Sequence, residues 1–433
     1  MTYRPVIDHV AAPIYLDPLS AVLLASAFIA AAALTLRRPA FGLGALLIAT
    51  PFDFSRDVLA TTISLPKCVL LGVLLALTAY PAVWRELRRA PAAPILGALL
   101  LYVMATALSA AGAAHLGPVL RETLKWLQYA ALFATAFCCY RLDGDDAALL
   151  TCVALAAIAV SLSALTQEFA GAPSGLYIGS AIVPRVAGLL EGPNQLSAYC
   201  AIAAAILGAW AVVRRAPITA LALGLVTCTD LLTFSRAGIV ALAIVFAMVV
   251  LWGGRRAWTA LRPALLGAIA GFAGCAWWAI YAHTPGVLRI SLAPSAYAGG
   301  VGNRDELWRA AWRMFLAHPL LGAGAGNFEL DLPKFGVYGV RTHANSWYLQ
   351  SLAEGGVVLF GATLALIGAS IGAFLRRPFV ASLRAQPPWV LAAIAASIAL
   401  ALHQIVDDFV FYPKVGAPWF LLLGIAAAAR RSA

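Results

Sequence analysis

The chain has 433 residues, of which 62% are hydrophobic and only 11% charged, and its mean hydropathy is +0.87. A water-soluble domain carries roughly 25% charged residues, so this composition excludes an ordinary soluble protein and indicates a chain embedded in a lipid bilayer. In a soluble chain the net charge of +11 would suggest a nucleic-acid partner. Here the surplus of Lys and Arg reports membrane topology instead, and we expect no binding of nucleic acid.

The cysteines and the N-terminal residues contribute little to a prediction of function. The seven cysteines all lie inside apolar stretches, and no two form a CxxC pair, so we expect neither a disulfide framework nor a zinc site. Arg4, Asp8 and Asp17 interrupt the first eighteen residues, which therefore do not resemble a cleaved signal peptide.

Windows of about twenty mostly apolar residues, the length that crosses a bilayer, predict the spans. In chain order they lie near 19–36, 67–84, 91–111, 122–140, 147–167, 194–213, 216–233, 237–254, 262–281, 346–375, 389–411 and 416–429. A short window at 40–52 gives thirteen crossings with an outer N-terminus if it spans, and twelve with both termini inside if it does not. Either way residues 1–433 form one all-α polytopic domain, because helices satisfy their own backbone in lipid. Gly267, Gly271 and Gly274 are expected to allow close helix packing.

Arginine clusters fall in alternate short connections, which predicts that those connections are cytoplasmic. The clusters are Arg37/Arg38, Arg85/Arg88/Arg89, Arg141, Arg214/Arg215, Arg255/Arg256/Arg262, Arg376/Arg377/Arg384 and Arg430/Arg431. The intervening connections, near 53–66, 112–118, 168–193, 234–236, 282–345 and 412–415, then face the opposite compartment. In a bacterium this is the periplasm, and the protein is expected in the inner membrane.

The connection 282–345 is longer than a turn between helices requires, and long loops are usually functional. Asn303 and Glu306 have the spacing of a helix start, and Leu307, Trp308, Ala311, Trp312 and Phe315 share one face, with Arg304, Arg309 and Arg313 elsewhere. This pattern predicts a short interfacial helix, either a membrane anchor or a lid beside a lipid-linked substrate. The following Gly322–Gly326 run has no strand before it, which favours a flexible turn over nucleotide binding.

His343 lies in the segment 341–350, which leads directly into a predicted span. The N-terminus of a helix carries partial positive charge, which keeps a histidine neutral, as a general base must be. The alternative is an interfacial hydrogen-bonding group without a catalytic role.

Several other charged residues map to the same outer face. Arg185 and Arg236 are candidates for binding phosphate, because guanidinium groups bind its oxygens bidentately; the alternatives are a solvated charge and a snorkelling charge. Arg121 and Lys125 either extend such a site or form an ion network on their helix with Glu122. His403, Asp407 and Asp408 would fit the proton path of a transporter.

Four fragments in this order resemble the O-antigen ligase family. They are Arg185-Val186-Ala187-Gly188 with Pro193-Asn194, Phe234-Ser235-Arg236-Ala237-Gly238, Trp308 through His318-Pro319-Leu320-Leu321-Gly322-Ala323-Gly324, and His343-Ala344-Asn345 through Leu349-Gln350 and Glu354-Gly355-Gly356. The similarity covers mainly residues 180–360. His343-Ala344-Asn345 departs from the adjacent His-Asn that is common in the family.

This resemblance implies a GT-C-type membrane glycosyltransferase that acts at the periplasmic face without a metal or other cofactor. Its donor would be an undecaprenyl-pyrophosphate-linked glycan and its acceptor the lipid A core, with inversion at the anomeric carbon. His343, Arg185 and Arg236 would be catalytic. The expected substrate-binding residues are Arg121, Lys125, Asn194, Arg304, Arg341 and Asn345.

The family also contains O-antigen polymerases and protein O-oligosaccharyltransferases, and the short stretch after the last predicted span favours the ligase. A transporter or flippase for a lipid-linked sugar remains the alternative from another class. It would need polar groups through the depth of the bilayer, whereas the cationic candidates gather at one face.

Overall fold

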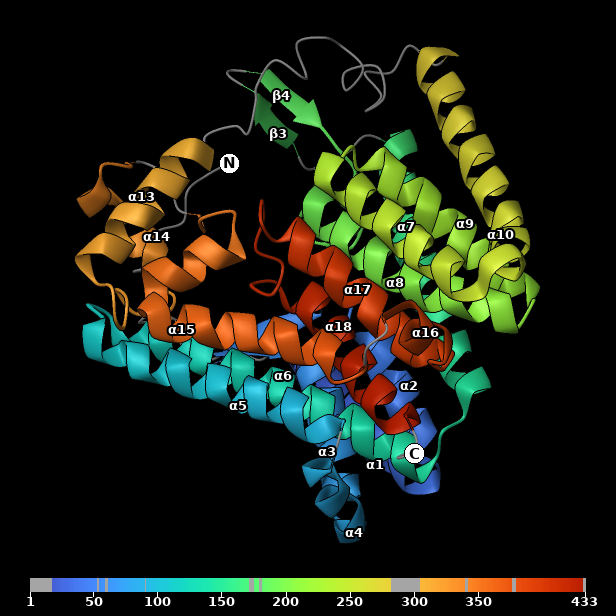
Figure 1. Ribbon diagram of the computed structural model, residues 1–433, viewed down its shortest axis with the longest axis horizontal. Coiled ribbons are helices and arrows are strands. Elements are labelled where there is room, and N and C mark those ends of the chain that lie inside the picture. The colour runs from blue at the N-terminus through green and yellow to red at the C-terminus, as the bar shows by residue number, and fades with distance from the viewer. Residues whose placement is uncertain are drawn as a thin grey trace.

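The computed structural model describes residues 18–52, 54–58, 61–89, 91–170, 175–178, 181–281, 304–338, 342–375 and 379–430. The first half contains α1 (Pro18–Arg37), α2 (Pro39–Ala49), β1 (Ser55–Val58), β2 (Thr61–Ser64), α3 (Leu65–Leu77), α4 (Pro81–Trp84), η2 (Arg85–Arg88), α5 (Ala92–Leu108), η3 (Ser109–Gly112), α6 (Leu116–Leu142), α7 (Asp146–Ala170), β3 (Gly175–Ile178), β4 (Ala181–Pro184) and α8 (Pro193–Val213). The second half contains α9 (Pro217–Leu232), α10 (Arg236–Tyr281), α13 (Arg304–Ala317), α14 (Phe328–Asp331), η4 (Leu332–Phe335), α15 (Trp347–Gly372), α16 (Phe379–Arg384), α17 (Pro388–His403) and α18 (Pro413–Ala429) (Figure 1).

Most of these elements are helices, and the four strands form two antiparallel hairpins, β1–β2 and β3–β4. Proline stands at the first or second position of α2, α3, α8, α9, α17 and α18. It is well tolerated there, because the first N–H groups of a helix have no intrahelical partner and the fixed φ of proline suits the helix. These prolines explain why several predicted spans begin close to where the helices begin.

The helices confirm the predicted all-α membrane fold. Six are long and apolar enough to cross a membrane, and α3 with α4 and η2, bent by 105°, makes a seventh if the pair is one span. Four shorter apolar helices are α2, α9, α17 and α18. The 11 residues of α2 extend only about 17 Å at the rise of an α-helix, less than the ~30 Å hydrocarbon core. The total of twelve or thirteen crossings, like the GT-C assignment, stays a prediction.

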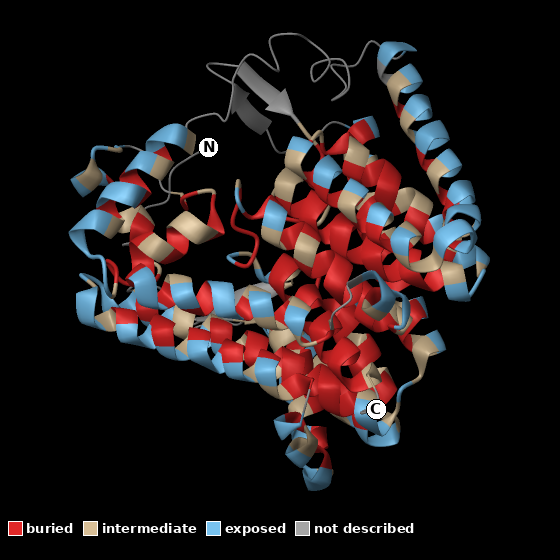
Figure 2. Cartoon of the chain, viewed as in Figure 1, coloured by how far each residue is buried: buried red, intermediate tan, exposed pale blue. Residues whose placement is uncertain are grey.

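The windows predicted at 237–254 and 262–281 both fall within α10, whose helical geometry is broken at Gly254 (φ 55°, ψ −135°). Glycine adopts this positive φ without the clash that a Cβ would cause. The part of α10 after this break is largely exposed and extends away from the rest of the bundle (Figures 1 and 2).

The buried centre of the bundle is formed by α8, α17 and α18, which Figure 2 shows mostly in red. In the most apolar window of α8, 89% of the residues are buried inside the protein, against 22% in α1 and 33% in α10. Small residues make this density achievable. A Cβ added at Gly424 of α18 would meet the backbone of Phe133 in α6, so these two helices touch backbone to backbone.

The arginine-rich connections gather on one face of the bundle. Their contacts join Arg38 to Asp143, Arg141 to Glu86, Arg384 to the carbonyl of Leu251, and Arg430 to the carbonyl of Ala373. The indole of Trp389 donates to Asp146, which links the connection before α17 to the one before α7. These contacts join several of the arginine-rich connections to neighbouring helix ends, and Arg376, Arg377 and Arg431 lie outside the described residues. The cytoplasmic placement of these connections stays a prediction.

The glycine-rich segment after α13 is a fixed joint and not the flexible turn expected from the sequence. Gly322, Gly324 and Gly326 all have positive φ, and the segment is hydrogen-bonded to α15 where that helix is broken at Gly356 (φ 60°). The bonds run from Ala323 N to Ala353 O (3.0 Å), from Gly324 N to Glu354 O (2.9 Å) and from Val357 N to Pro319 O (2.9 Å). Two of the fragments that resemble the family are therefore parts of one structural joint.

The helix predicted in the long connection is α13. Leu307 and Ala311 of its predicted apolar face are buried together with Ala310 and Met314, whereas Trp312 of the same face is 48% exposed. The role of α13 as a membrane anchor or as a lid stays a prediction. Residues 282–303, including the expected cap Asn303, lie outside the described residues.

The joint at Gly356 gives a stability prediction. A Cβ at this position would collide with the backbone of Leu320, and a non-glycine residue is strained at positive φ. We expect Gly356→Ala to lower the free energy of unfolding by about 2 kcal/mol or more, measured as a lower melting temperature in detergent. Gly361→Ala in the same helix, where a Cβ meets no atom within 4 Å, is the control and should melt as the wild type does.

Candidate functional site

The centre of the candidate site is the carboxylate of Asp407, in the connection between α17 and α18. Asp407 is only 2% exposed. Oδ2 accepts a hydrogen bond from Asn194 Nδ2 at 2.8 Å and lies 3.6 Å from a guanidinium nitrogen of Arg304. Oδ1 accepts from the backbone N–H of Asp408. One carboxylate thus connects the start of α8, the start of α13 and the α17–α18 connection.

Arg185 is fixed beside this carboxylate. Its Nε donates to the carbonyl of Thr233 at 2.6 Å, and its terminal nitrogen donates to Asn194 Oδ1 at 3.3 Å. Burial lowers the pKa of Arg185 to about 10, with a further lowering from Arg304 and Arg236 and an opposing effect from Asp407. The guanidinium therefore remains charged at neutral pH.

The backbone next to Arg185 is held by a glutamine of α7. Gln167 Oε1 accepts from the N–H groups of Ala187 and Gly188 at 2.9 and 2.8 Å, and its Nε2 donates to the carbonyl of Gly188. Lys414 at the start of α18 donates to the carbonyl of Leu189. The Arg185 segment is therefore anchored on both sides.

Arg236 is the first residue of α10 and lies exposed at the tight turn that follows α9. The preceding Phe234 has a positive φ of 51°, and the Thr233 hydroxyl accepts from the N–H of Ser235. Arg236 is close enough to Arg185 to depress the pKa of that group. Arg185 and Arg304 thus lie beside one buried carboxylate, and Arg236 lies within electrostatic range of Arg185, so three guanidinium groups gather in one region where an anionic ligand could bind.

His343 lies just before α15 and is 8% exposed. Its Nδ1 accepts from the N–H of Asn345 at 3.1 Å, and its Nε2 is 2.9 Å from the hydroxyl of Tyr412. Asn345 reaches this position with a positive φ of 49°. Because Nδ1 accepts, the neutral ring carries its proton on Nε2 and donates it to Tyr412; this tautomer is assigned from the hydrogen bonds.

The pKa of His343 is lowered chiefly by burial, and Arg304 and Lys125 lower it further, while Asp407 opposes them. The predicted neutral state thus has burial as its main cause rather than the helix N-terminus. In this arrangement neither ring nitrogen offers a free lone pair. The geometry therefore suits a hydrogen-bonding, orienting role better than the expected general base.

The other candidate residues do not share one location. Lys125 is ion-paired with Glu122 at 2.7 Å and lies 4.7 Å from the ring centre of Phe411, which gives it both the intrahelical pair and a place beside the site. Arg121 is exposed, and within the described part of the chain no hydrogen bond or ion pair joins it to Asp407. Arg341 lies outside the described residues.

The α17–α18 connection supplies the residues that the sequence did not assign to the site. Gln404 Oε1 accepts from the N–H groups of Phe409 and Val410, and the N–H of Trp347 is shared by the carbonyls of Gln404 and Asp407. Asp407 was attributed to a transporter path, and Tyr412 was not singled out. A pair of acidic residues between two apolar helices is the one signal that pointed to this connection.

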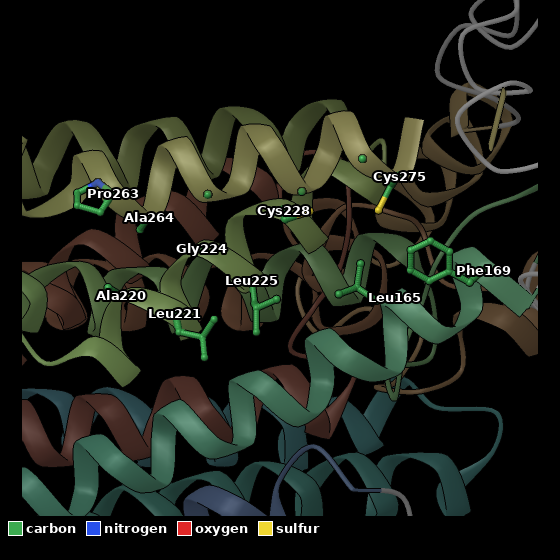
Figure 3. A pocket seen from close by; sticks show the side chains of 13 residues that line it. Leu165, Phe169, Ala220, Leu221, Gly224, Leu225, Cys228, Pro263, Ala264 and Cys275 are labelled. Carbon is green, nitrogen blue, oxygen red and sulfur yellow. The ribbon is translucent and has the colours of Figure 1, made fainter. Parts of the chain in front are cut away.

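An apolar cleft of about 510 Å³ lies between α7, α9 and the second half of α10. Figure 3 shows Leu165, Leu225 and Cys275 among its lining side chains. Gly267 and Gly274 also line it, and a Cβ at either would meet no atom within 4 Å. The predicted close packing at these two glycines is therefore wrong, because they border open space. Only Gly271 is near another helix, 3.1 Å from Cys228 Sγ when a Cβ is added.

Aromatic contacts connect this cleft to the arginines. The ring of Phe234, two residues before Arg236, lies 6.3 Å from the ring of Phe272 on α10, next to Gly271 in the wall of the cleft. As for metals, no three His, Cys, Asp or Glu side chains gather at a place that could hold an ion in the described ranges, and metal independence stays a prediction.

Residues 219–364 match a family model described as O-antigen ligase. This segment is about a third of the chain and contains Arg236, Arg304 and His343. Arg185 and Asp407, which contact Thr233 and Arg304 of that segment, lie outside it, as does Asn194. No curated protein matches the chain.

Proposed function

We propose that the chain is a member of the O-antigen ligase family, whose model matches residues 219–364, and that it transfers a glycan from undecaprenyl pyrophosphate to the lipid A core at the periplasmic face of the bacterial inner membrane. The observation that carries this proposal is the meeting of Arg185, Arg236, Arg304 and His343 around Asp407. Together with Asp407 these residues come from five separate segments of the chain. The sequence predicted Arg185, Arg236 and His343 as catalytic and Arg304 as substrate-binding, and it assigned Asp407 to a transporter path.

The cluster of guanidinium groups at this site suits a diphosphate leaving group. When the glycosidic bond breaks, negative charge accumulates on the diphosphate oxygens, and fixed guanidinium groups stabilise this charge more in the transition state than in the bound donor. Arg236 is exposed at the rim and can contact the ligand directly, while Arg185 and Arg304 are held by Thr233 and Asp407. Because these guanidinium groups stabilise the negative charge on the diphosphate, the proposed reaction requires no metal ion.

His343 is proposed to orient the acceptor rather than to deprotonate it. An acceptor hydroxyl attacks the anomeric carbon from the face opposite the diphosphate, so the new bond forms with inversion. The proton of that hydroxyl is lost to solvent as the bond forms, because the departing diphosphate lies on the opposite face of the sugar. The neutral imidazole donates a hydrogen bond from Nε2 to Tyr412. It thereby holds in place the groups that bind the acceptor hydroxyl.

The apolar cleft between α7, α9 and α10 is proposed to hold the polyprenyl tail of the donor. Its wall at Gly271 lies next to Phe272, which contacts Phe234 close to Arg236. A lipid in this cleft would therefore present its diphosphate to the arginines. The glycines at positions 267 and 274 leave room for the tail because they have no side chains.

Two alternative activities belong to the same family, and a third belongs to a different class of protein. An O-antigen polymerase or a protein O-oligosaccharyltransferase would use the same donor with a different acceptor. A lipid-linked sugar transporter would move the donor without breaking a bond. Purified protein mixed with lipid-linked glycan and lipid A core separates these functions, because only the ligase forms glycan-modified core and a transporter forms no product.

Replacing the cationic and imidazole groups tests the site. Arg185→Ala, Arg236→Ala and His343→Ala should each reduce glycan transfer by about a hundredfold or more, since each removes a group that stabilises or orders the transition state. Arg309→Ala is the control, because that exposed arginine pairs with Asp305 on α13. Transfer at the wild-type rate by all three site variants would contradict the assignment.

The pH dependence of transfer follows from the directions of two pKa values. Protonation of His343 would place a hydrogen on Nδ1 against the N–H of Asn345, so the rate should fall on acidification, with an apparent pKa below the usual 6.5. Loss of the proton from Arg185, whose pKa is about 10, should limit the rate on the alkaline side. We expect a plateau between these limits in kcat/KM.

Asp408 provides the control for the acidic limb, because burial raises its pKa to about 7. Asp408→Asn keeps an oxygen that can accept from the N–H of Phe411, as Asp408 does now, and removes the titration. The acidic limb should remain in this variant. Its disappearance would assign the limb to Asp408 and remove His343 from the explanation.

Filling the cleft tests where the lipid tail binds. Gly274→Leu and Gly267→Leu should raise the KM for lipid-linked donor by about tenfold, because the added side chain occupies space now open to the tail. Gly368→Leu in α15, also a position with open space around it, is the matched control and should leave KM unchanged. Equal KM values for all three variants would place the tail elsewhere.

A further inference from the structure

Tyr412 is the residue that lies beyond His343 on the Nε2 side of the ring. The imidazole is buried and has both nitrogens engaged, Nδ1 by the N–H of Asn345 and Nε2 by the Tyr412 hydroxyl. A substrate that approaches Nε2 therefore meets the phenol first. Tyr412 is only partly buried and stands directly before Pro413, the first residue of α18.

We propose that Tyr412 is the acceptor-binding residue of this enzyme, and that its phenol oxygen, polarised by the Nε2–H of His343, accepts the hydrogen bond of the attacking sugar hydroxyl. This inference rests on the proposed function and adds a group to the same site. His343 then acts through Tyr412 and does not itself touch the substrate.

The hydrogen-bond inventory of a phenol supports this arrangement. The phenol oxygen has two lone pairs and one proton. One lone pair receives the His343 Nε2–H. Gln195 is the other hydrogen-bond partner of the phenol, and the inference requires the amide orientation in which its oxygen accepts the phenol proton. The second lone pair can receive a sugar hydroxyl, which then has its own lone pair available for the anomeric carbon.

The phenol orients the hydroxyl and does not remove its proton. Burial raises the pKa of Tyr412, and the carboxylates of Asp407 and Asp408 raise it further, so the side chain stays a neutral phenol. The bond between the acceptor oxygen and the anomeric carbon forms, the bond to the diphosphate breaks, and the acceptor proton passes to water. The proposed step uses no additional base, oxidant or metal.

The surroundings of Tyr412 suit a sugar. Phe411 is 40% exposed and its ring lies 5.1 Å from that of Tyr412 in an edge-to-face arrangement. Aromatic rings offer apolar faces to the C–H groups of a sugar, and aromatic side chains lose little conformational entropy when a ligand binds. The α17–α18 connection therefore brings an aromatic surface and a polarised hydroxyl to the same place.

The test removes a single oxygen. Tyr412→Phe should lower kcat/KM for the acceptor by about tenfold to a hundredfold, while the KM for the donor and the slow hydrolysis of donor by water stay as in the wild type. Tyr348→Phe is the matched control, because its hydroxyl donates to the carbonyl of Ala401 and not to His343; it should transfer normally.

The pairing with His343 gives a second readout. If the two residues act as one unit, the double variant Tyr412→Phe with His343→Ala should be no slower than the slower single variant. Wild-type transfer by Tyr412→Phe, with Arg236→Ala and His343→Ala inactive, would overturn the role of Tyr412 and leave the proposed function intact. Wild-type transfer by Arg236→Ala and His343→Ala as well would overturn the proposed function and this inference with it.

Discussion

The buried carboxylate of Asp407 is the interaction on which the site depends. An isolated charge in a protein interior is costly, by several kcal/mol even after relaxation, so this carboxylate is stable only with the partners that surround it. Asn194, Arg304 and the N–H of Asp408 contact it directly, and Arg185 is joined to it through Asn194. The carboxylate therefore helps to fix the positions of Arg185 and Arg304.

The fold was largely predictable because its signals are local. Apolar windows of bilayer length, helix-initiating prolines such as Pro193 and Pro413, and arginines in alternate connections each act over a few residues. The breaks at Gly254 and Gly356 were not predictable in the same way. Whether a glycine ends a helix, bends it or only packs depends on the segment that docks against it, which for Gly356 is separated by more than thirty residues.

The site was predictable to the extent that charge in an apolar chain is rare. Arg185, Arg236 and His343 stood out for this reason, and the structure brings them to one region. Tyr412 did not stand out, because an aromatic residue at the end of a span is typical of the membrane interface. The tautomer of His343 was also beyond the sequence, since it is set by the N–H of Asn345 at a positive φ.

Under the proposed function, the order of the sites follows the order of the parts of the donor. The lipid tail, the diphosphate and the sugar are successive parts of one molecule, and the cleft, the arginines and the His343–Tyr412 pair are successive regions of the protein. The α9–α10 turn carries both Phe234, which contacts the wall of the cleft, and Arg236. A shift of this turn would move the tail and the diphosphate together relative to Tyr412, so its tight geometry at Phe234 is a constraint on catalysis as well as on the fold.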